Sequence, residues 1–152
     1  MNYISIPKGL LPRVALNAYS DSGAVAKDAF HRAGKAFLRK VAQELGLQPS
    51  EYSLRNNLAG IAVSGEVTLH TDDLYIQLHE SCVGSGGVSV LFRGCDSRKD
   101  CCGHQNNFAS MQRLAEEGEQ ERFMRHLEDI ITQTRARKAE KALTAAALLV
   151  AA

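Results

Sequence analysis

The residues best suited to chemistry are concentrated in one stretch, positions 93–107, which reads Arg-Gly-Cys-Asp-Ser-Arg-Lys-Asp-Cys-Cys-Gly-His-Gln-Asn-Asn. Thiols, an imidazole and charged groups lie close together there, and such groups can bind metals, attack electrophiles or bind anions. Binding and catalytic residues are often carried by loops. We therefore expect a functional site in this stretch.

A zinc site is one interpretation of the stretch, because thiolate and imidazole are ligands that Zn²⁺ prefers. The spacing argues against it, since no Cys-x₂-Cys pair is present and adjacent cysteines seldom both bind one tetrahedral ion without strain. We predict no cofactor, with zinc as the alternative. The alternative ligands are Cys95, Cys101 or Cys102, His104, and one of Cys82 and His79.

A cysteine nucleophile is a second interpretation. Cys101 or Cys102 lies near Lys99 and His104, which could lower the pKa of the thiol and supply a base. Catalytic Cys and His residues are usually brought together by the fold rather than by adjacency in sequence. The enzymatic alternative is thus a zinc- or cysteine-dependent hydrolase, centred on the same cysteines and histidines.

Recognition of a partner is the interpretation we favour. Arg93, Arg98 and Lys99 could neutralise phosphate or acidic groups, and the Asn106 amide could hydrogen-bond to a base edge or to backbone. The chain has 18 Lys and Arg against 17 Asp and Glu, which is unlike a strongly basic nucleic-acid coat. The partner is predicted to be a protein or a nucleic acid, with nucleic acid the weaker of the two.

The segment before this stretch has the periodicity of β-strands. Apolar and polar residues alternate between Ile61 and Arg93, with turn residues at 71–73 and a glycine-rich connection at 81–87. We predict a three-stranded antiparallel meander over 61–93. Its outer face would be polar and carry Thr68, His70, Tyr75, Gln77, His79, Ser89 and Arg93.

Helical spacing of apolar residues flanks this meander on both sides. After an irregular lead at 1–19, the spacing predicts a helix over 20–46. Beyond the polar loop at 94–107, we predict a short helix capped by Asn107 and then a long helix, together covering 108–150. The long helix is longer than a domain of this size can cover, so we predict a homodimer formed through its C-terminal end.

These elements indicate a single α+β domain over 1–152, with helices covering the apolar face of the sheet. The sequence has neither a signal-peptide pattern nor the run of about 20 apolar residues that a membrane helix needs, so we expect a cytoplasmic protein. We favour a non-enzymatic binding protein that uses the outer sheet face and the 93–107 loop. The predicted binding residues are Tyr75, His79, Arg93, Arg98, Lys99, Asp100, His104 and Asn106.

Overall fold

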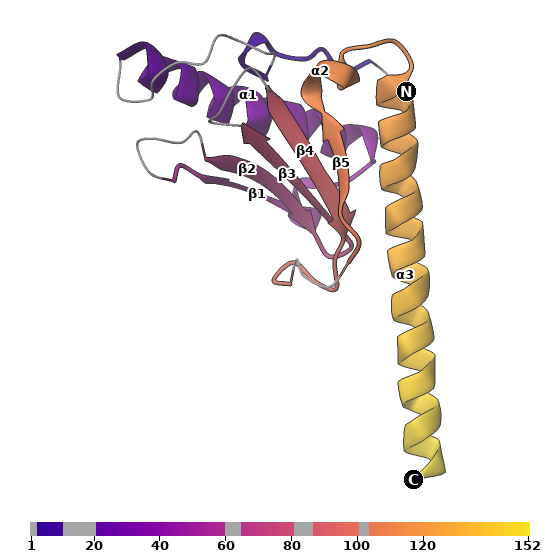
Figure 1. Cartoon of the computed structure of the whole chain (residues 1–152). Coiled ribbons are helices and arrows are strands. Elements are labelled where there is room, and N and C mark those ends of the chain that lie inside the picture. The colour runs from indigo at the N-terminus through magenta and orange to yellow at the C-terminus, as the bar shows by residue number, and fades with distance from the viewer. Residues whose placement is uncertain (1–2, 11–20, 60–64, 81–86, 101–103) are drawn as a thin grey trace.

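The fold is an antiparallel sheet with helices before and after it (Figure 1). The computed structural model describes residues 3–10, 21–59, 65–80, 87–100 and 104–152. The elements in chain order are a 3₁₀ turn at Lys8–Leu10, α1 (Asp21–Glu44), a second 3₁₀ turn at Pro49–Glu51, β1 (Tyr52–Asn57), β2 (Glu66–Thr71), β3 (Leu74–Glu80), β4 (Val88–Gly94), β5 (Asn107–Ser110), α2 (Met111–Leu114) and α3 (Glu119–Ala151).

The sheet is a five-stranded meander in which every strand pairs with its neighbours in sequence. Strands β2, β3 and β4 confirm the predicted meander, whereas Ile61 and Val63 lie outside the described residues. The two edge strands are not predicted by the local alternation of residues. In β1 the polar half, Arg55 to Asn57, hides the alternation, and β5 has only four residues.

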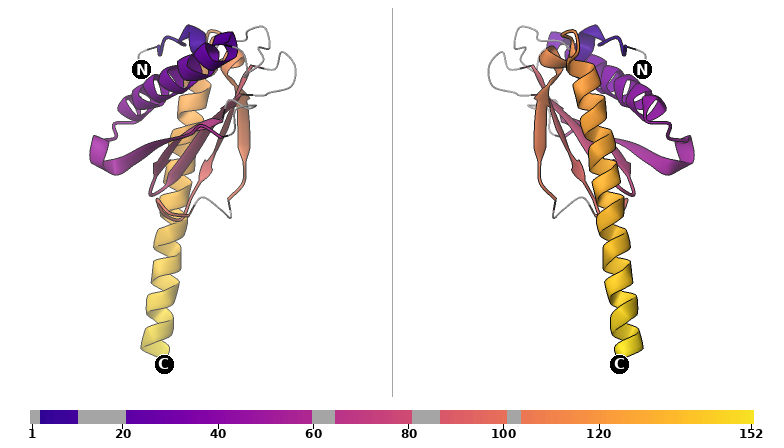
Figure 2. Two further views of the ribbon diagram at one scale, coloured as in Figure 1. Left: turned by 90° about the vertical axis from the view of Figure 1, so that its left-hand side faces the viewer. Right: turned by 90° about the vertical axis from the view of Figure 1, so that its right-hand side faces the viewer.

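Helix α1 confirms the helix predicted over 20–46, and it covers one face of the sheet (Figure 2). Phe30, Phe37 and Val41 on this helix are buried. Gly34 brings the helix close to β2, because a Cβ at this position would lie 3.0 Å from a methyl carbon of Val67. Burial of these apolar side chains against the sheet stabilises both elements.

Helix α3 covers the same face of the sheet beside β4. The Phe92 ring of β4 meets the Phe123 ring edge to face, with centroids 5.1 Å apart, and Leu127 is fully buried. The helix confirms the long C-terminal helix, and its last turns project beyond the sheet (Figure 1). No helix within the described ranges is both long and apolar enough to cross a membrane.

The predicted cap of the short helix is wrong. Asn107 begins β5, and Ser110 caps α2 by accepting a hydrogen bond from the Arg113 amide at 3.2 Å. Residues 107–110 pair with β4 instead of entering the helix, because strand pairing satisfies their backbone groups there. Phe108 therefore lies on the sheet and not in a helical core.

Truncating a core residue should unfold the protein more easily than truncating a surface one. Leu78→Ala, at a fully buried position of β3, is expected to lower the free energy of unfolding by about 2–5 kcal/mol because it leaves a cavity. The matched control is Leu58→Ala, at a position that is 54% exposed, where a change within about 0.5 kcal/mol is expected. Urea denaturation followed by circular dichroism measures both, and equal effects would contradict this placement of the core.

Candidate functional site

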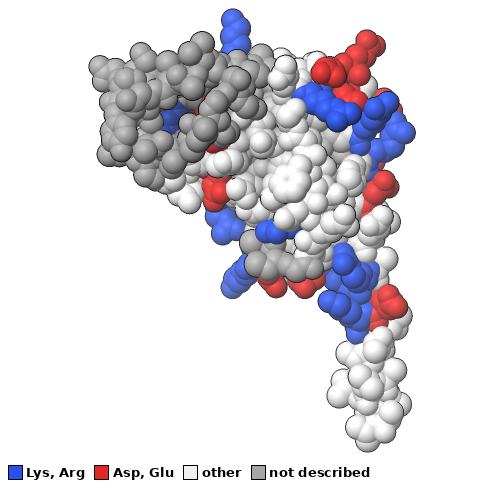
Figure 3. Space-filling model, in the orientation of Figure 1, with Lys and Arg blue, Asp and Glu red and all other residues white. Residues whose placement is uncertain are grey.

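The candidate site begins with the sheet face opposite α1 and α3, which we call the outer face. Strand register aligns Arg55, Thr68, Gln77, Leu91 and Phe108 in one row across all five strands on this face. Phe108 is 69% exposed. An uncharged area lies over β4 and β5, with charged side chains around it (Figure 3). The outer face thus presents an apolar centre with a charged rim.

Polar side chains connect neighbouring strands across the outer face. The Tyr75 hydroxyl donates to Gln77 at 3.1 Å, and the Gln77 amide donates to Glu66 on β2. The Arg93 guanidinium lies 5.1 Å from the centre of the Tyr75 ring and donates to Asn106 at 2.9 Å. This network holds the polar half of the face in one arrangement.

The outer face is less open than the sequence predicts, because Thr68, His70 and Tyr75 are all buried. The 93–107 loop folds back over this end of the sheet, and the His70 ring meets the Ser97 carbonyl at 2.9 Å. Arg55 contacts the other ring nitrogen at 2.9 Å, and since Arg can only donate, that nitrogen accepts. Burial lowers the pKa of His70 below 6.5, although the hydrogen bond to the Ser97 carbonyl by itself would raise this pKa. His70 is thus a neutral support of the loop.

A hollow of about 370 Å³ lies on the outer face near β1 and β2. Arg55, Asn57, Glu66 and Lys99 are among the residues that line it. Lys99 is exposed, and its ammonium group has no partner among the described residues. The hollow therefore offers cationic hydrogen-bond donors on the same face as the apolar centre, nearer to β1.

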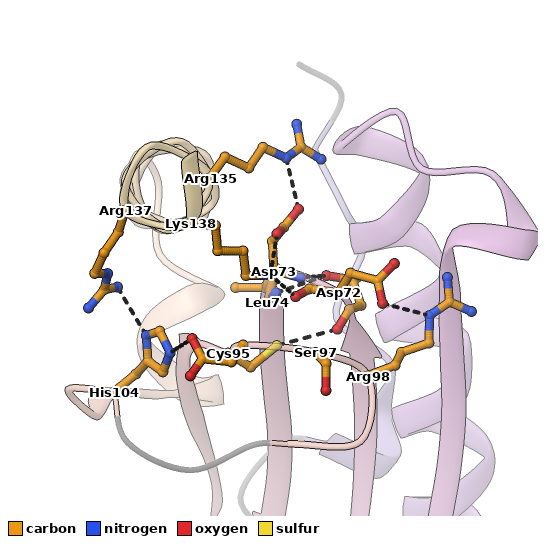
Figure 4. Close-up of polar contacts among 12 residues, drawn as sticks. Asp72, Asp73, Leu74, Cys95, Ser97, Arg98, His104, Arg135, Arg137 and Lys138 are labelled. Carbon is orange, nitrogen blue, oxygen red and sulfur yellow. Dashed lines mark hydrogen bonds and ion pairs between the residues drawn. The ribbon is translucent and has the colours of Figure 1, made fainter. Parts of the chain in front are cut away.

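The β2–β3 turn is tied to α3 by one carboxylate (Figure 4). Asp73 accepts from Arg135 at 2.8 Å and from Lys138 at 2.8 Å, and Lys138 also donates to the Asp72 carbonyl. Burial alone would raise the pKa of Asp73, but the hydrogen bonds from Lys138 and Arg135 outweigh it and hold this pKa below 3.8. Asp73 is therefore an ionised anchor for α3.

His104 ties the end of the 93–107 loop to the same helix. Its ring contacts Asp96 at 3.0 Å and Arg137 at 3.0 Å. The hydrogen bond with His104 lowers the pKa of Asp96. Gly94 makes room for this arrangement, since a Cβ there would lie 2.4 Å from the Thr134 hydroxyl and 2.9 Å from the His104 ring. The loop is thus held between the sheet and α3.

Cys95 is unsuited to the chemistry that the sequence suggested. It is fully buried, its thiol donates to the Thr71 carbonyl at 3.3 Å, and burial raises its pKa to about 11. The thiolate that a zinc ligand or a nucleophile requires is therefore scarce at neutral pH. Cys82, Cys101 and Cys102 lie outside the described residues. Within the residues that are described, no three His, Cys, Asp or Glu side chains are arranged to hold a metal ion.

The structure brings together only part of the predicted binding set. Tyr75, Arg93 and Asn106 form one contact chain, while Lys99 borders the hollow. Arg98 donates to the Ser50 carbonyl at 2.8 Å and lies 3.6 Å from Asp72, so it holds the loop in place.

Two further members of the set are not part of this contact chain. Asp100 forms an isolated bridge with Ser97, and His79 lies on the outer face opposite Glu66 and Ser89, toward the end of β3 away from the loop. The sequence missed three residues of the site. The missed residues come from elements that were not predicted or were treated only as helix surface. They are Arg55, Phe108 and Arg137.

Comparison with known proteins adds no functional assignment. No family model, curated protein or solved structure matches the chain. The geometry of the molecule therefore carries the functional argument.

Removing the charge of Asp73 should loosen α3 at neutral pH. Asp73→Asn is expected to lower the free energy of unfolding by about 1 kcal/mol at pH 7, the scale of partly exposed ion pairs. Because the folded pKa is depressed, this contribution is present above about pH 3.8 and is lost as the pH falls through the folded pKa. Urea denaturation at pH 7 and near pH 3 should show the difference shrinking, and a constant difference would contradict this anchor.

Cys95 should resist alkylation in the folded protein. In a variant with Cys82, Cys101 and Cys102 replaced by Ser, iodoacetamide at pH 7 is expected to label Cys95 at least about a hundredfold more slowly than in guanidinium. A pKa of about 11 instead of 9.0 lowers the thiolate fraction by that factor, and burial restricts access further. Mass spectrometry measures the labelled fraction, and similar rates in the two states would show that Cys95 is accessible.

Proposed function

We propose that this protein binds another protein through its outer sheet face. One observation carries the proposal: α1 and α3 pack on the same side of the sheet, and the opposite side exposes Phe108 on β5 and carries a hollow lined by Arg55 and Lys99 toward β1 and β2. An exposed aromatic ring on a face that also carries cationic side chains is typical of an interaction site. The role is that of a binding protein rather than an enzyme.

The apolar centre supplies the part of the surface that gains most from burial. Phe108 and the half-buried Leu91 are neighbours across the β4–β5 pair. Aromatic side chains at the centre of an interface contribute strongly because they remove a large apolar area from water. A partner therefore places an apolar side chain over Phe108.

The rim favours a partner with acidic side chains. Arg55, Arg93 and Lys99 lie on or beside the outer face, and Glu66 is the carboxylate among them. Glu66 is engaged by Gln77, and Arg93 is engaged by Asn106. Arg55 likewise contacts His70, so Lys99 is the cation best placed to receive a carboxylate from the partner.

A protein partner fits these side chains better than a nucleic acid does. Stacking of successive bases needs several exposed aromatic rings, and Tyr75 on the same face is buried. Arg93 and Arg98 already hold parts of this chain together, so fewer cations are available for phosphates. Nuclease treatment of the crosslinked adducts, in the test below, separates nucleic-acid binding from protein binding.

The projecting end of α3 offers a second apolar surface. Leu143, Leu148, Leu149 and Val150 are all exposed there. Pairing of two copies through this end would bury them, and the predicted homodimer stays a prediction. A cytoplasmic location, as expected from the sequence, fits the free thiol of Cys95.

Photocrosslinking from the outer face tests the proposed function. Phe108 is replaced by p-benzoylphenylalanine in the cells that make the protein, and the same residue placed at Thr132 on α3 serves as the exposed control. We expect protein adducts from position 108 and none of the same mass from position 132. Adding Lys99→Glu should reduce the yield of the adduct severalfold, because a carboxylate on the partner would then be repelled.

Two results would overturn the proposed function. The absence of protein adducts from position 108 would show that the outer face has no protein partner. Adducts that disappear on nuclease treatment would assign the face to nucleic acid instead.

A further inference from the structure

We propose that the protein partner adds an extended strand antiparallel to β5, in the groove between β5 and α3, with an acidic side chain beside Arg137. This inference rests on the proposed function, because it specifies how a protein partner is held. Strand addition to an exposed sheet edge gives affinity through main-chain hydrogen bonds and specificity through neighbouring pockets.

The two edges of the sheet differ in how well they are protected. An edge strand leaves every second N–H and C=O pointing away from the sheet, and charged residues or Pro usually discourage further pairing. Strand β1 carries Arg55 and follows directly on a turn that contains Pro49. Strand β5 reads Asn-Phe-Ala-Ser and has neither. Within the described chain, neither β1 nor β5 has a strand on its free side, and β5 is the edge that lacks these protecting residues.

A groove of about 220 Å³ runs beside this open edge. Phe92, Phe108, Leu114 and Phe123 give it apolar walls. The charged residues at its end are already paired within the chain, since Glu119 pairs with Arg113 at 2.9 Å and with Arg122 at 2.8 Å. This part of the groove therefore fits an apolar side chain of the added strand.

A polar cleft of about 480 Å³ continues the groove along α3, because His126 lines both. Arg137 in this cleft donates to His104, and among the described residues it has no carboxylate partner. The Thr134 hydroxyl also lines the cleft and is buried without a hydrogen-bond partner in the described part of the chain. Glu140 also lines this cleft and would repel an acidic side chain. We therefore expect the acidic side chain of the partner to lie beside Arg137 and away from Glu140.

The direction of the added strand follows from that of β5. The chain enters β5 at Asn107, which lines the polar cleft, and leaves it at Ser110, which caps α2 beside the apolar groove. An antiparallel strand runs the other way, so its apolar residue comes first and its acidic residue second. Phe123 and Arg137 are about 21 Å apart along the helix, which corresponds to about six residues of an extended strand.

Selection from a randomised peptide library tests the inference. The library displays 12-residue segments fused at both ends, so that no free carboxyl terminus is present. We expect peptides with an apolar residue about six positions before Asp or Glu. The best peptide is then synthesised with blocked ends, and its affinity is measured by fluorescence polarisation.

Changes in the peptide test the main-chain hydrogen bonds without altering the protein. N-methylation at alternate positions is expected to weaken binding about tenfold or more, and N-methylation at the intervening positions should have little effect. This period of two arises because only every second N–H faces β5. Uniform tolerance of N-methylation would overturn strand addition.

Paired substitutions test the acidic contact. Arg137→Gln and replacement of the acidic residue by its amide should each weaken binding about tenfold, and together no more than either alone. Arg125→Gln is the matched control, since Arg125 is exposed on α3 outside the groove and is held by Glu121 at 2.6 Å. Circular dichroism checks that each variant is folded, and equal effects of Arg137→Gln and Arg125→Gln would overturn the contact.

Failure of the inference can be distinguished from failure of the proposed function. Peptides that lose affinity with Lys99→Glu but not with Arg137→Gln would place binding on the outer face alone and overturn strand addition. If no peptide is enriched but a protein adduct forms from position 108, strand addition is overturned and the proposed function stands. No enriched peptide and no adduct would overturn both proposals.

Discussion

The Asp73 carboxylate ties the middle of α3 to the β2–β3 turn, beyond the part of the helix that is packed on the sheet through Phe123 and Leu127, and the cleft at Arg137 depends on that position. It accepts from Arg135 and Lys138, which come more than 60 residues later in the chain. The turn that carries it is itself fixed, because the Thr71 hydroxyl accepts from the amides of Asp73 and Leu74. The anchored helix forms one wall of the groove beside β5 and presents Arg137 to His104.

The 93–107 loop has a structural role that its composition does not reveal. His70, Arg98 and His104 attach the described parts of this loop to the sheet, the β1 side and α3 respectively. These contacts place Lys99 at the rim of the hollow and leave β5 with an open edge. Side chains that resemble a reactive cluster in the sequence thus fix the loop, and the surfaces available to a partner lie next to it.

Local periodicity was sufficient to predict the central strands and the two long helices. The alternation from Leu74 to Leu78 and the spacing of Phe30, Phe37 and Val41 are strong signals because each element buries one regular face. The edge strands could not be predicted in this way. Strand β1 has a polar half, and the four residues of β5 continue directly into α2. Their extended conformation depends on hydrogen bonds to β2 and β4, which are tertiary contacts.

The amino-acid sequence by itself determined the fold class, the order of its main elements and the loop in which polar groups gather, because these follow from residue types at short spacing. Only the tertiary structure decided which of those groups are accessible. Cys95 is buried by contact with Thr71, whereas Phe108 is exposed because α1 and α3 both pack on the opposite face. Burial and pKa depend on neighbours that are distant in the chain, and no local pattern encodes them.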